Sequence, residues 1–342
     1  MIPPVTLNHF AYAADGNYAL QLKIAVASLL YALRQRTRAI YIHILDLGLT
    51  DKQWNQLIDL WGRIQSKAIF KRHIISTQQF AKYKKWNNSY APYARLELPD
   101  LIPDAEWCLY ADCDTLFLCD PQQLEPLLDN NKALIGHRNP IAISNEFDKK
   151  WFDDKSIHLD FSKYICSGLV AINLNWFREH NAKQKCIVFL DKYPDVLTPD
   201  QSALNYVCRN NIGLFSDGWG DFAYEAIKTD ACYCLHYAGT TPWEPPKSWM
   251  FYCGEHKLLD IWYEFAHEIA HEPNLKSKFM PNHKFLIPKI IATILWPFLR
   301  IVAFYGVYPK SFADHAIAIR QRCNSKVISN IRNCLFKVHP LN

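Results

Sequence analysis

The stretch YADCDTLFL, residues 110–118, sets two aspartates, Asp112 and Asp114, at the end of an apolar run that favours a buried β-strand. Two carboxylates this close repel each other unless a positive group lies between them. In a strand, residues two positions apart point to the same side, so we expect both side chains to converge. Two converging carboxylates suit a hard divalent cation such as Mg²⁺ or Mn²⁺.

The chain around this stretch alternates between strand and helix patterns. The predicted strands are residues 9–15, 39–46, 68–75, 106–112, the first part of 164–177, and 232–239. Helices are predicted at 18–33, 51–60, 91–98, the end of 164–177, and 198–210. Apolar residues at three- and four-residue spacing indicate the first, and Thr198-Pro199 opens the last. This alternation predicts an α/β fold with a mostly parallel sheet covered on both faces. Ligands of such sheets collect at the carboxyl ends of strands, so Asp15 and Asp112 should face one crevice.

The composition fits a large globular domain with reduced thiols. Hydrophobic residues make up 50% of the 342 residues, which is ample for a core, and no Gly/Ser-rich linker or repeat is present. The eleven cysteines are an odd number and form no CxxC pair, so free thiols in a cytoplasmic protein are expected, not a zinc site. Pro3 and Pro4 interrupt any N-terminal signal-peptide pattern.

The net charge of +5 is distributed unevenly. Residues 276–342 hold eleven Lys and Arg against one acid and carry +10, which leaves −5 on residues 1–275. We expect one catalytic domain over 1–275 and a basic, aromatic-rich extension over 276–342. The uncharged run between Lys289 and Arg300 has ten residues, whereas a membrane-spanning helix needs about 20. The extension therefore predicts contact with an anionic membrane surface, or else a helix packed on the domain; no recognition motif indicates nucleic acid.

The D-x-D pattern alone is weakly specific. Two solvated aspartates at a turn would give the same letters. Haloacid-dehalogenase-like phosphatases also carry D-x-D after a strand, followed by x-T/V, but here Leu116 takes that position and Thr115 comes one place early. The surrounding motifs decide between these alternatives.

Six segments together resemble glycosyltransferase family 8, and within it the bacterial lipopolysaccharide and lipooligosaccharide galactosyl- and glucosyltransferases. They are YAADGNYALQLKIAVASLL (12–30), YARLEL (93–98), LYADCDTLFL (109–118), SGLVAINLNWFR (167–178), DQSALN (200–205) and HYAGTTPW (236–243). The resemblance implies a GT-A fold, a UDP-sugar donor, Mn²⁺ or Mg²⁺, and retention of anomeric configuration. It also implies UDP-glucose or UDP-galactose as donor, a lipid-linked glycan as acceptor, and a peripheral position on the cytoplasmic face of the inner membrane.

The resemblance also implies roles for individual residues. Asp112, Asp114 and His236 would be the metal ligands, and Asp200 and Gln201 the catalytic pair. The donor-binding residues would be Asp15, Asn17 and Tyr18 at the uridine, with Arg95, Asp112, Ser167, Gly168, Asp200 and Gly239. Simpler roles stay open: a core histidine for His236, a surface charge for Arg95, a packing aromatic for Tyr18 and a helix cap for Asp200. Retention favours a front-side reaction with Gln201 stabilising positive charge; a covalent intermediate is the alternative.

Two departures from the family pattern leave a rival function open. Cys166-Ser167-Gly168 stands where the family usually has Asn-Ala-Gly or Asn-Ser-Gly, and Thr241 precedes Pro242-Trp243 where the galactosyltransferases have a lysine. Lys247 could replace that lysine. The rival is a non-catalytic relative that binds UDP-sugar or acts as a scaffold at the membrane. The sequence does not indicate an oligomeric state.

Overall fold

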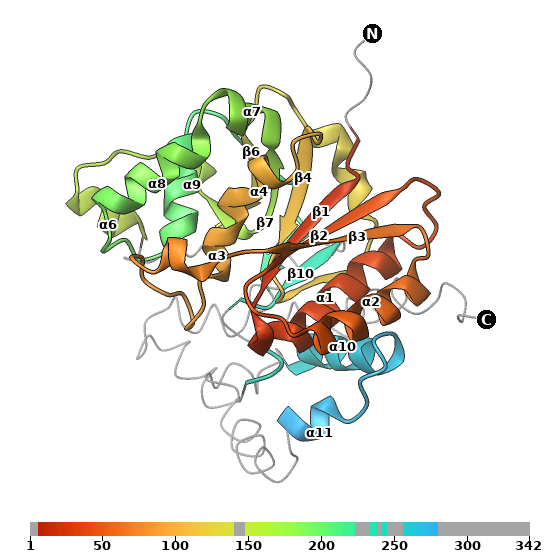
Figure 1. Ribbon diagram of the computed structural model, residues 1–342. Helices are drawn as coiled ribbons and strands as arrows, with labels where there is room; N and C mark the ends of the chain where they lie inside the picture. The colour runs from red at the N-terminus through yellow and green to blue at the C-terminus, as the bar shows by residue number, and fades with distance from the viewer. Residues whose placement is uncertain (1–5, 140–147, 223–232, 239–240, 245–255, 280–342) are drawn as a thin grey trace, which may run out of the picture.

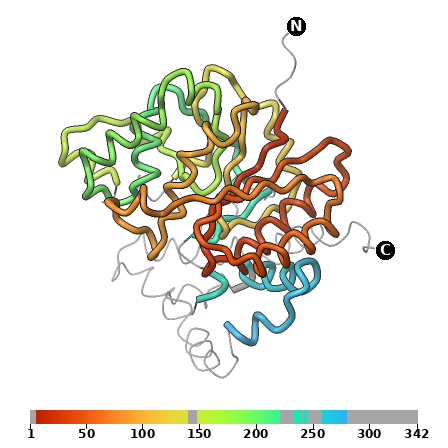
Figure 2. Tube along the Cα trace, in the orientation of Figure 1, coloured from red at the N-terminus to blue at the C-terminus, as the bar shows by residue number. Residues whose placement is uncertain are grey.

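A seven-stranded sheet forms the centre of the molecule (Figures 1 and 2). The computed structural model describes residues 6–139, 148–222, 233–238, 241–244 and 256–279. The strand order is β3-β2-β1-β4-β7-β6-β8. The strands are β1 (His9–Ala14), β2 (Ile40–Asp46), β3 (Ala68–Ile74), β4 (Trp107–Ala111), β6 (Leu134–Arg138), β7 (Ile165–Asn173) and β8 (Ile212–Leu214).

The predicted mostly parallel sheet is confirmed, with one strand reversed. β1 pairs in parallel with both β2 and β4, and β2 with β3. β7 runs antiparallel to β4 and β6, with Trp107 opposite Asn173. All nine residues of β7 are buried. A strand buried on both faces shows no alternation that reveals its direction, so the sequence could not show the reversal.

Helices cover both faces of the sheet, as Figure 1 shows. Alternate residues of β1 enter different cores: Phe10 and Tyr12 belong to one, Ala11 and Ala13 to the other. The first core contains residues of α1 (Ala19–Ala32), α2 (Asp51–Ile64) and α10 (His256–Glu268). The second contains residues of α3 (Ala91–Ala94), α4 (Leu98–Leu101), α6 (Asp148–Asp154), α7 (Leu174–Glu179), α8 (Ala182–Lys192) and α9 (Pro199–Cys208). These helices fix the positions of the loops at the carboxyl ends of the strands.

A second sheet of three short strands lies beside the first. Its order is β5 (Thr115–Phe117), β10 (Cys234–His236) and β9 (Trp219–Phe222). β10 runs antiparallel to β5, which places His236 opposite Thr115. The buried Ser28 of α1 accepts a hydrogen bond from the backbone N–H of Phe117 at 2.9 Å, which fixes β5 on that helix. This sheet brings residue 236 next to residue 114 across a long stretch of sequence.

The C-terminal extension remains a prediction. The last described helix, α11 (Leu275–Phe279), crosses the expected boundary at residue 275, and residues 280–342 lie outside the described part. Within the described residues, no helix combines the length and apolarity needed to cross a membrane. The cysteines in those residues are all free, in line with the expected thiols.

Three histidines form a hydrogen-bonded row across β1, β2 and β3. His43 Nε2 lies 3.1 Å from Nδ1 of His9, and His43 Nδ1 lies 3.0 Å from Nε2 of His73. Each neutral imidazole has one N–H and one lone pair, so a row of neutral rings satisfies both contacts of His43. Burial, together with repulsion from His9, His73 and Lys71, lowers the pKa of His43 to about 3.

This row makes the stability of the fold sensitive to acid. An unfolded histidine takes up a proton near pH 6.5, whereas folded His43 does so only near pH 3. Because the unfolded state then binds more protons, the free energy of unfolding should decrease by about 2 kcal/mol between pH 6.5 and pH 5 through His43 alone. Urea unfolding at several pH values measures this decrease. His43→Phe should flatten the dependence, and an equal slope in both proteins would remove His43 as its cause.

Candidate active site

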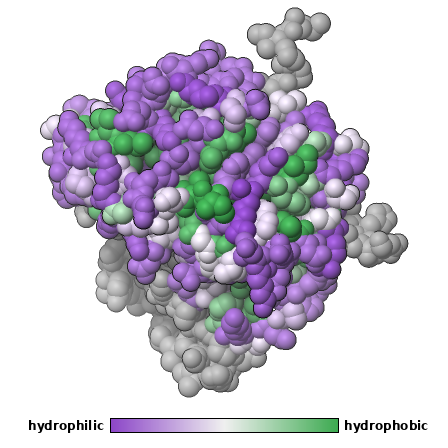
Figure 3. Space-filling model, viewed as in Figure 1, coloured by the Kyte–Doolittle hydropathy of each residue, from purple (hydrophilic) through white to green (hydrophobic). Residues whose placement is uncertain are grey.

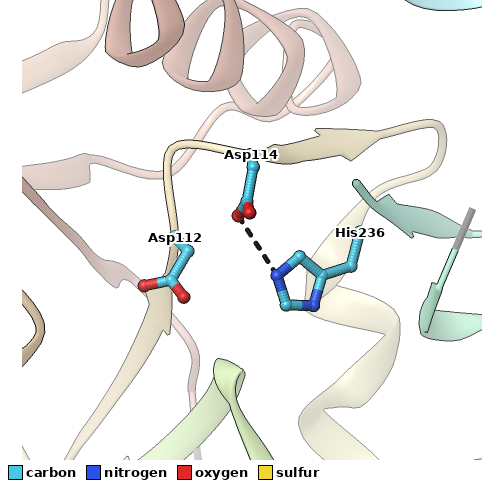
Figure 4. A group of neighbouring side chains, drawn as sticks. All are labelled: Asp112, Asp114 and His236. Atoms are coloured by element: carbon cyan, nitrogen blue, oxygen red, sulfur yellow. Dashed lines mark ion pairs between the residues drawn. The ribbon is translucent and has the colours of Figure 1, made fainter. Parts of the chain in front are cut away.

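Asp112 and Asp114 lie in a turn between β4 and β5, not in a strand. The expectation that strand alternation aligns them is therefore wrong; the turn aligns them instead. The backbone N–H of Asp112 donates to the carbonyl of Gly168 at 2.8 Å. The intervening Cys113 is buried. Figure 4 shows the Asp114 carboxylate pointing toward His236, with Asp112 beside them. The turn thus presents two acids together.

His236 completes a group of three potential metal ligands. One ligand atom from each of Asp112, Asp114 and His236 lies within 4.8 Å of the others. His236 Nε2 is 3.1 Å from Oδ1 of Asp114. That oxygen is buried, yet it makes no hydrogen bond of good geometry among the described residues. A buried oxygen without such a partner fits a cation ligand, because buried polar atoms are otherwise hydrogen-bonded.

Gly168 leaves space next to these ligands. A Cβ added there would lie 2.3 Å from Cε1 and 2.7 Å from Nε2 of His236, and 2.9 Å from Oδ2 of Asp112. Any other residue would therefore intrude between the two ligand groups. This space, beside ligand atoms that lie close together, fits a bound cation.

The charges of the three ligands depend on one another. Burial raises the pKa of Asp112, against the effect of Arg95. Burial also opposes ionisation of Asp114, but His236 holds the pKa of Asp114 below its ordinary value. Although burial disfavours the imidazolium, Asp114 raises the pKa of His236 well above its usual range. Since a metal ligand must be deprotonated, a cation bound here would replace the His236 proton.

Arg95 lies behind the acids and is only 2% exposed. Its Nη2 donates to Oδ1 of Asp112 at 2.9 Å, and its Nε lies 3.3 Å from Oδ2 of Asp200. It also donates to the backbone carbonyls of Pro92 and Ser167. Arg95 therefore joins a carboxylate of the D-x-D turn to one of α9 and is not a surface charge. Whether it also contacts a donor stays a prediction.

Asp200 and Gln201 sit in the first turn of α9, both buried. Ser167 connects to both: its hydroxyl donates to Oδ2 of Asp200 at 3.0 Å, and its backbone N–H donates to Oε1 of Gln201 at 3.1 Å. The side chain of Asp200 makes no helix-capping hydrogen bond; Thr198 holds the N-cap position. Asp200 and Gln201 therefore face Ser167, on the strand that also carries Gly168.

A cavity of about 780 Å³ connects these residues. The predicted residues on its wall are Tyr18, Arg95, Asp112, Asp114, Ser167, Gly168, Asp200, Gln201 and His236. Asp15 and Asn17 are not on this wall. Asp15 instead accepts from the Ser89 hydroxyl at 2.7 Å and from the backbone N–H of Asn17 at 2.9 Å. Gly239 and Lys247 lie outside the described residues.

Sequence reasoning missed several residues of the wall, among them Trp86 and Asp148. Trp86, 42% exposed, lines the cavity beside the turn at Asn87 and Asn88, both of which have positive φ. The Asn-Asn pair is a turn signal that could have drawn attention to Trp86. Asp148 is a buried acid on the same wall. No sequence pattern distinguishes it from the exposed acids of the same helix, Asp153 and Asp154.

Comparison with known proteins identifies the family of the chain. The sequence pattern of Glycosyl transferase family 8 matches residues 9–245, well over half of the chain. The chain belongs to this family. It is 26% identical to a provisionally named glycosyltransferase of Haemophilus influenzae, over 75% of this chain and 82% of the relative. It is 23% identical to the lipopolysaccharide 1,3-galactosyltransferase of Salmonella typhimurium, over 71% of this chain and 74% of the relative.

Solved structures show the fold of this glycosyltransferase. The galactosyltransferase LgtC, in complex with donor and acceptor sugar analogues, superposes with a TM-score of 0.63 at 22% identity and covers 79% of this chain and 99% of its own. The bifunctional glycosyltransferase WbbM superposes with a TM-score of 0.65 at 16% identity, covering 80% of this chain and 52% of its own. The expected GT-A fold is confirmed.

The space at Gly168 gives a direct test of the ligand group. Gly168→Ala should weaken Mn²⁺ binding at least about tenfold, as expected for a disturbed ligand environment, because the new methyl group would overlap His236. Calorimetric titration with Mn²⁺ in the presence of UDP measures the affinity. Gly62→Ala is the matched control, since nothing lies within 4 Å of a Cβ there. Unchanged Mn²⁺ affinity in Gly168→Ala would contradict this position for the cation.

Proposed function

We propose that this glycosyltransferase is a retaining hexosyltransferase that moves glucose or galactose from a UDP-sugar to a lipid-linked oligosaccharide such as a lipopolysaccharide core. The observation that carries the proposal is the convergence of Asp112, Asp114 and His236 on a cavity that Gln201 also lines. The name of the Salmonella relative supports the substrate class, and the donor and acceptor sugar analogues in the LgtC complex support a sugar donor and a sugar acceptor.

Asp112, Asp114 and His236 would hold one divalent cation. An imidazole nitrogen beside carboxylate oxygens favours Mn²⁺ somewhat over Mg²⁺. When bound, the cation supplies positive charge to the donor diphosphate as UDP departs. Arg95 holds Asp112 in place through the 2.9 Å contact. Tyr18, on the cavity wall, would stack on the uracil, with Asp15 and Asn17 at the uridine.

Asp200 and Gln201 would bind the donor sugar. Asp200 uses Oδ2 for Ser167 and Arg95, and no described residue hydrogen-bonds its Oδ1, which leaves that oxygen for a sugar hydroxyl. An amide is a poor nucleophile, so we propose front-side transfer through a short-lived oxocarbenium–UDP ion pair. The acceptor hydroxyl attacks from the face that UDP leaves and gives its proton to the departing phosphate. The Gln201 carbonyl dipole stabilises the positive charge.

Transfer should depend on the donor, on the cation and on both acids. Incubation with UDP-glucose or UDP-galactose and Mn²⁺ should release UDP, and EDTA should stop the release reversibly. Asp112→Asn or Asp114→Asn should abolish it, because each removes a charged ligand. A coupled assay for UDP measures the rate. Asp153→Asn, at an exposed residue paired with Lys149, is the control.

The rival non-catalytic function gives a different result in the same assay. A relative that only binds UDP-sugar would bind UDP in calorimetry and release none from either donor. Two departures from the family pattern favour this rival: Cys166 in place of an asparagine, and Thr241 in place of a lysine. Full activity in EDTA would contradict the cation-dependent mechanism.

We further propose that residues 276–342 hold the enzyme on the cytoplasmic face of the inner membrane. Truncation after Phe279 keeps α11 and its 2.6 Å ion pair between Lys276 and Asp260 but removes nine Lys and Arg. Each Lys or Arg near an anionic membrane surface contributes about 1 kcal/mol to membrane binding. If about four of the nine face lipid, the partition coefficient of the protein into the membrane should decrease by about three powers of ten.

Sedimentation with anionic vesicles measures this partitioning. The full chain should sediment with them, less so at high salt, and the truncated chain should stay in solution while still releasing UDP from the donor. If the full chain ignores anionic vesicles, or if truncation unfolds the catalytic domain, the extension is a packed structural element and the membrane proposal is wrong.

A further inference from the structure

Asp148 is a buried acid on the cavity wall that the proposed reaction leaves without a role. It begins α6 and is 3% exposed. Its Oδ2 accepts hydrogen bonds from the Tyr164 hydroxyl at 3.0 Å and from Nε2 of Gln201 at 3.2 Å. The Thr198 hydroxyl lies 2.8 Å from Oδ2 and 2.9 Å from Oδ1. Burial raises the pKa of Asp148, but the hydrogen bonds from these three donors favour its ionised form, which is an acceptor only.

These contacts determine which way the Gln201 amide points. The NH₂ end must face Asp148, since two oxygens at 3.2 Å would repel each other. The carbonyl end must face the backbone N–H of Ser167, which can only donate, at 3.1 Å. A flipped amide would lose both contacts, so Asp148 and Ser167 hold the orientation together. The orientation matters because the carbonyl end attracts a developing positive charge and the NH₂ end repels it.

The network around Asp148 holds this arrangement firmly. The Ser202 hydroxyl lies 2.9 Å from that of Thr198 and 3.1 Å from that of Tyr164. Both hydroxyls donate to Asp148, so Ser202, which has one hydroxyl hydrogen, donates to one of them. Asp148, Tyr164 and Ser202 are buried, and Thr198 is partly exposed on the cavity wall. A buried network in which each member has a partner is rigid, which suits a group that must be oriented before the reaction.

We propose that Asp148 is a positioning residue for Gln201: its carboxylate fixes the amide so that the carbonyl oxygen, not the NH₂ group, is presented to the donor sugar. This inference rests on the proposed function, because Gln201 has its role only in the transferase. Asp148 itself contacts neither sugar nor cation in this account and acts through the amide alone.

The test is a double-mutant cycle on Asp148 and Gln201. Asp148→Ala should lower kcat by about 10- to 100-fold, the usual range for a residue that orients another, with KM for the UDP-sugar nearly unchanged. In a Gln201→Ala background, Asp148→Ala should change kcat less than about twofold, because no amide remains to be oriented. Asp148→Asn keeps one acceptor oxygen and should lie between wild type and Asp148→Ala.

A matched control separates positioning from structural support. Tyr164→Phe removes a donor to Asp148 and costs stability, but it leaves the contact of Asp148 with Gln201. It should therefore lower the melting temperature and leave kcat unchanged. If Tyr164→Phe lowers kcat as much as Asp148→Ala does, or if Asp148→Ala lowers kcat equally in both backgrounds, Asp148 is a structural residue and the proposal is wrong.

Two measurements keep this proposal distinct from the proposed function. The same four proteins can also be compared by thermal unfolding, which requires no donor. If their free energies of unfolding show no coupling between Asp148 and Gln201, the contact itself is contradicted. If Asp148→Ala is too unstable to purify, the Asp148→Asn cycle decides by the same criterion. Wild-type protein that binds UDP without turnover would contradict the proposed function, whereas normal turnover in Asp148→Ala would contradict only the positioning role.

Discussion

Arg95 supplies the buried positive charge on which the site depends. Asp112 and Asp200 come from segments far apart in the sequence, and two such carboxylates on one cavity would repel each other without a cation between them. The guanidinium contacts both and is almost completely buried. Because burial of an unpaired charge is costly, Arg95 and the two acids have to be placed together. The Asp114 carboxylate also needs a positive partner, and Nε2 of His236 lies 3.1 Å from its Oδ1.

The sequence predicted the parts of this arrangement that have a period or a motif. Strand and helix spacing located β1 to β4 and their helices, and the family motifs located Asp112, Asp114, His236, Asp200 and Gln201. It could not predict contacts between distant segments that leave no pattern. The reversed direction of β7, the turn that aligns the two aspartates, and the burial of Arg95 and Asp148 all depend on tertiary packing. Figure 3 shows a mostly polar surface with several apolar patches on the face in view.

The departures from the family pattern gain a physical meaning from the structure. Cys166 lies beside Nδ1 of His236, so it stands behind a proposed ligand. The second partner of a ligating imidazole influences its orientation and basicity. We therefore expect Cys166 to influence the proposed ligand His236, whereas the resemblance implies that an asparagine there would bond a sugar hydroxyl. Thr241, at the position of the family lysine, lies on the cavity wall with no positive charge to offer a diphosphate. Donor choice and rate are the properties these two residues should alter, while the ligand group itself is intact.

The central claim is that Asp112, Asp114 and His236 hold the cation that carries the donor diphosphate. Anomalous diffraction at the manganese edge, from crystals grown with Mn²⁺ and UDP, tests it most directly. The account predicts one manganese peak bound by an oxygen of each aspartate, by Nε2 of His236 and by the UDP phosphates. UDP bound in the cavity with no manganese at these three side chains, or with manganese bound elsewhere, would contradict it.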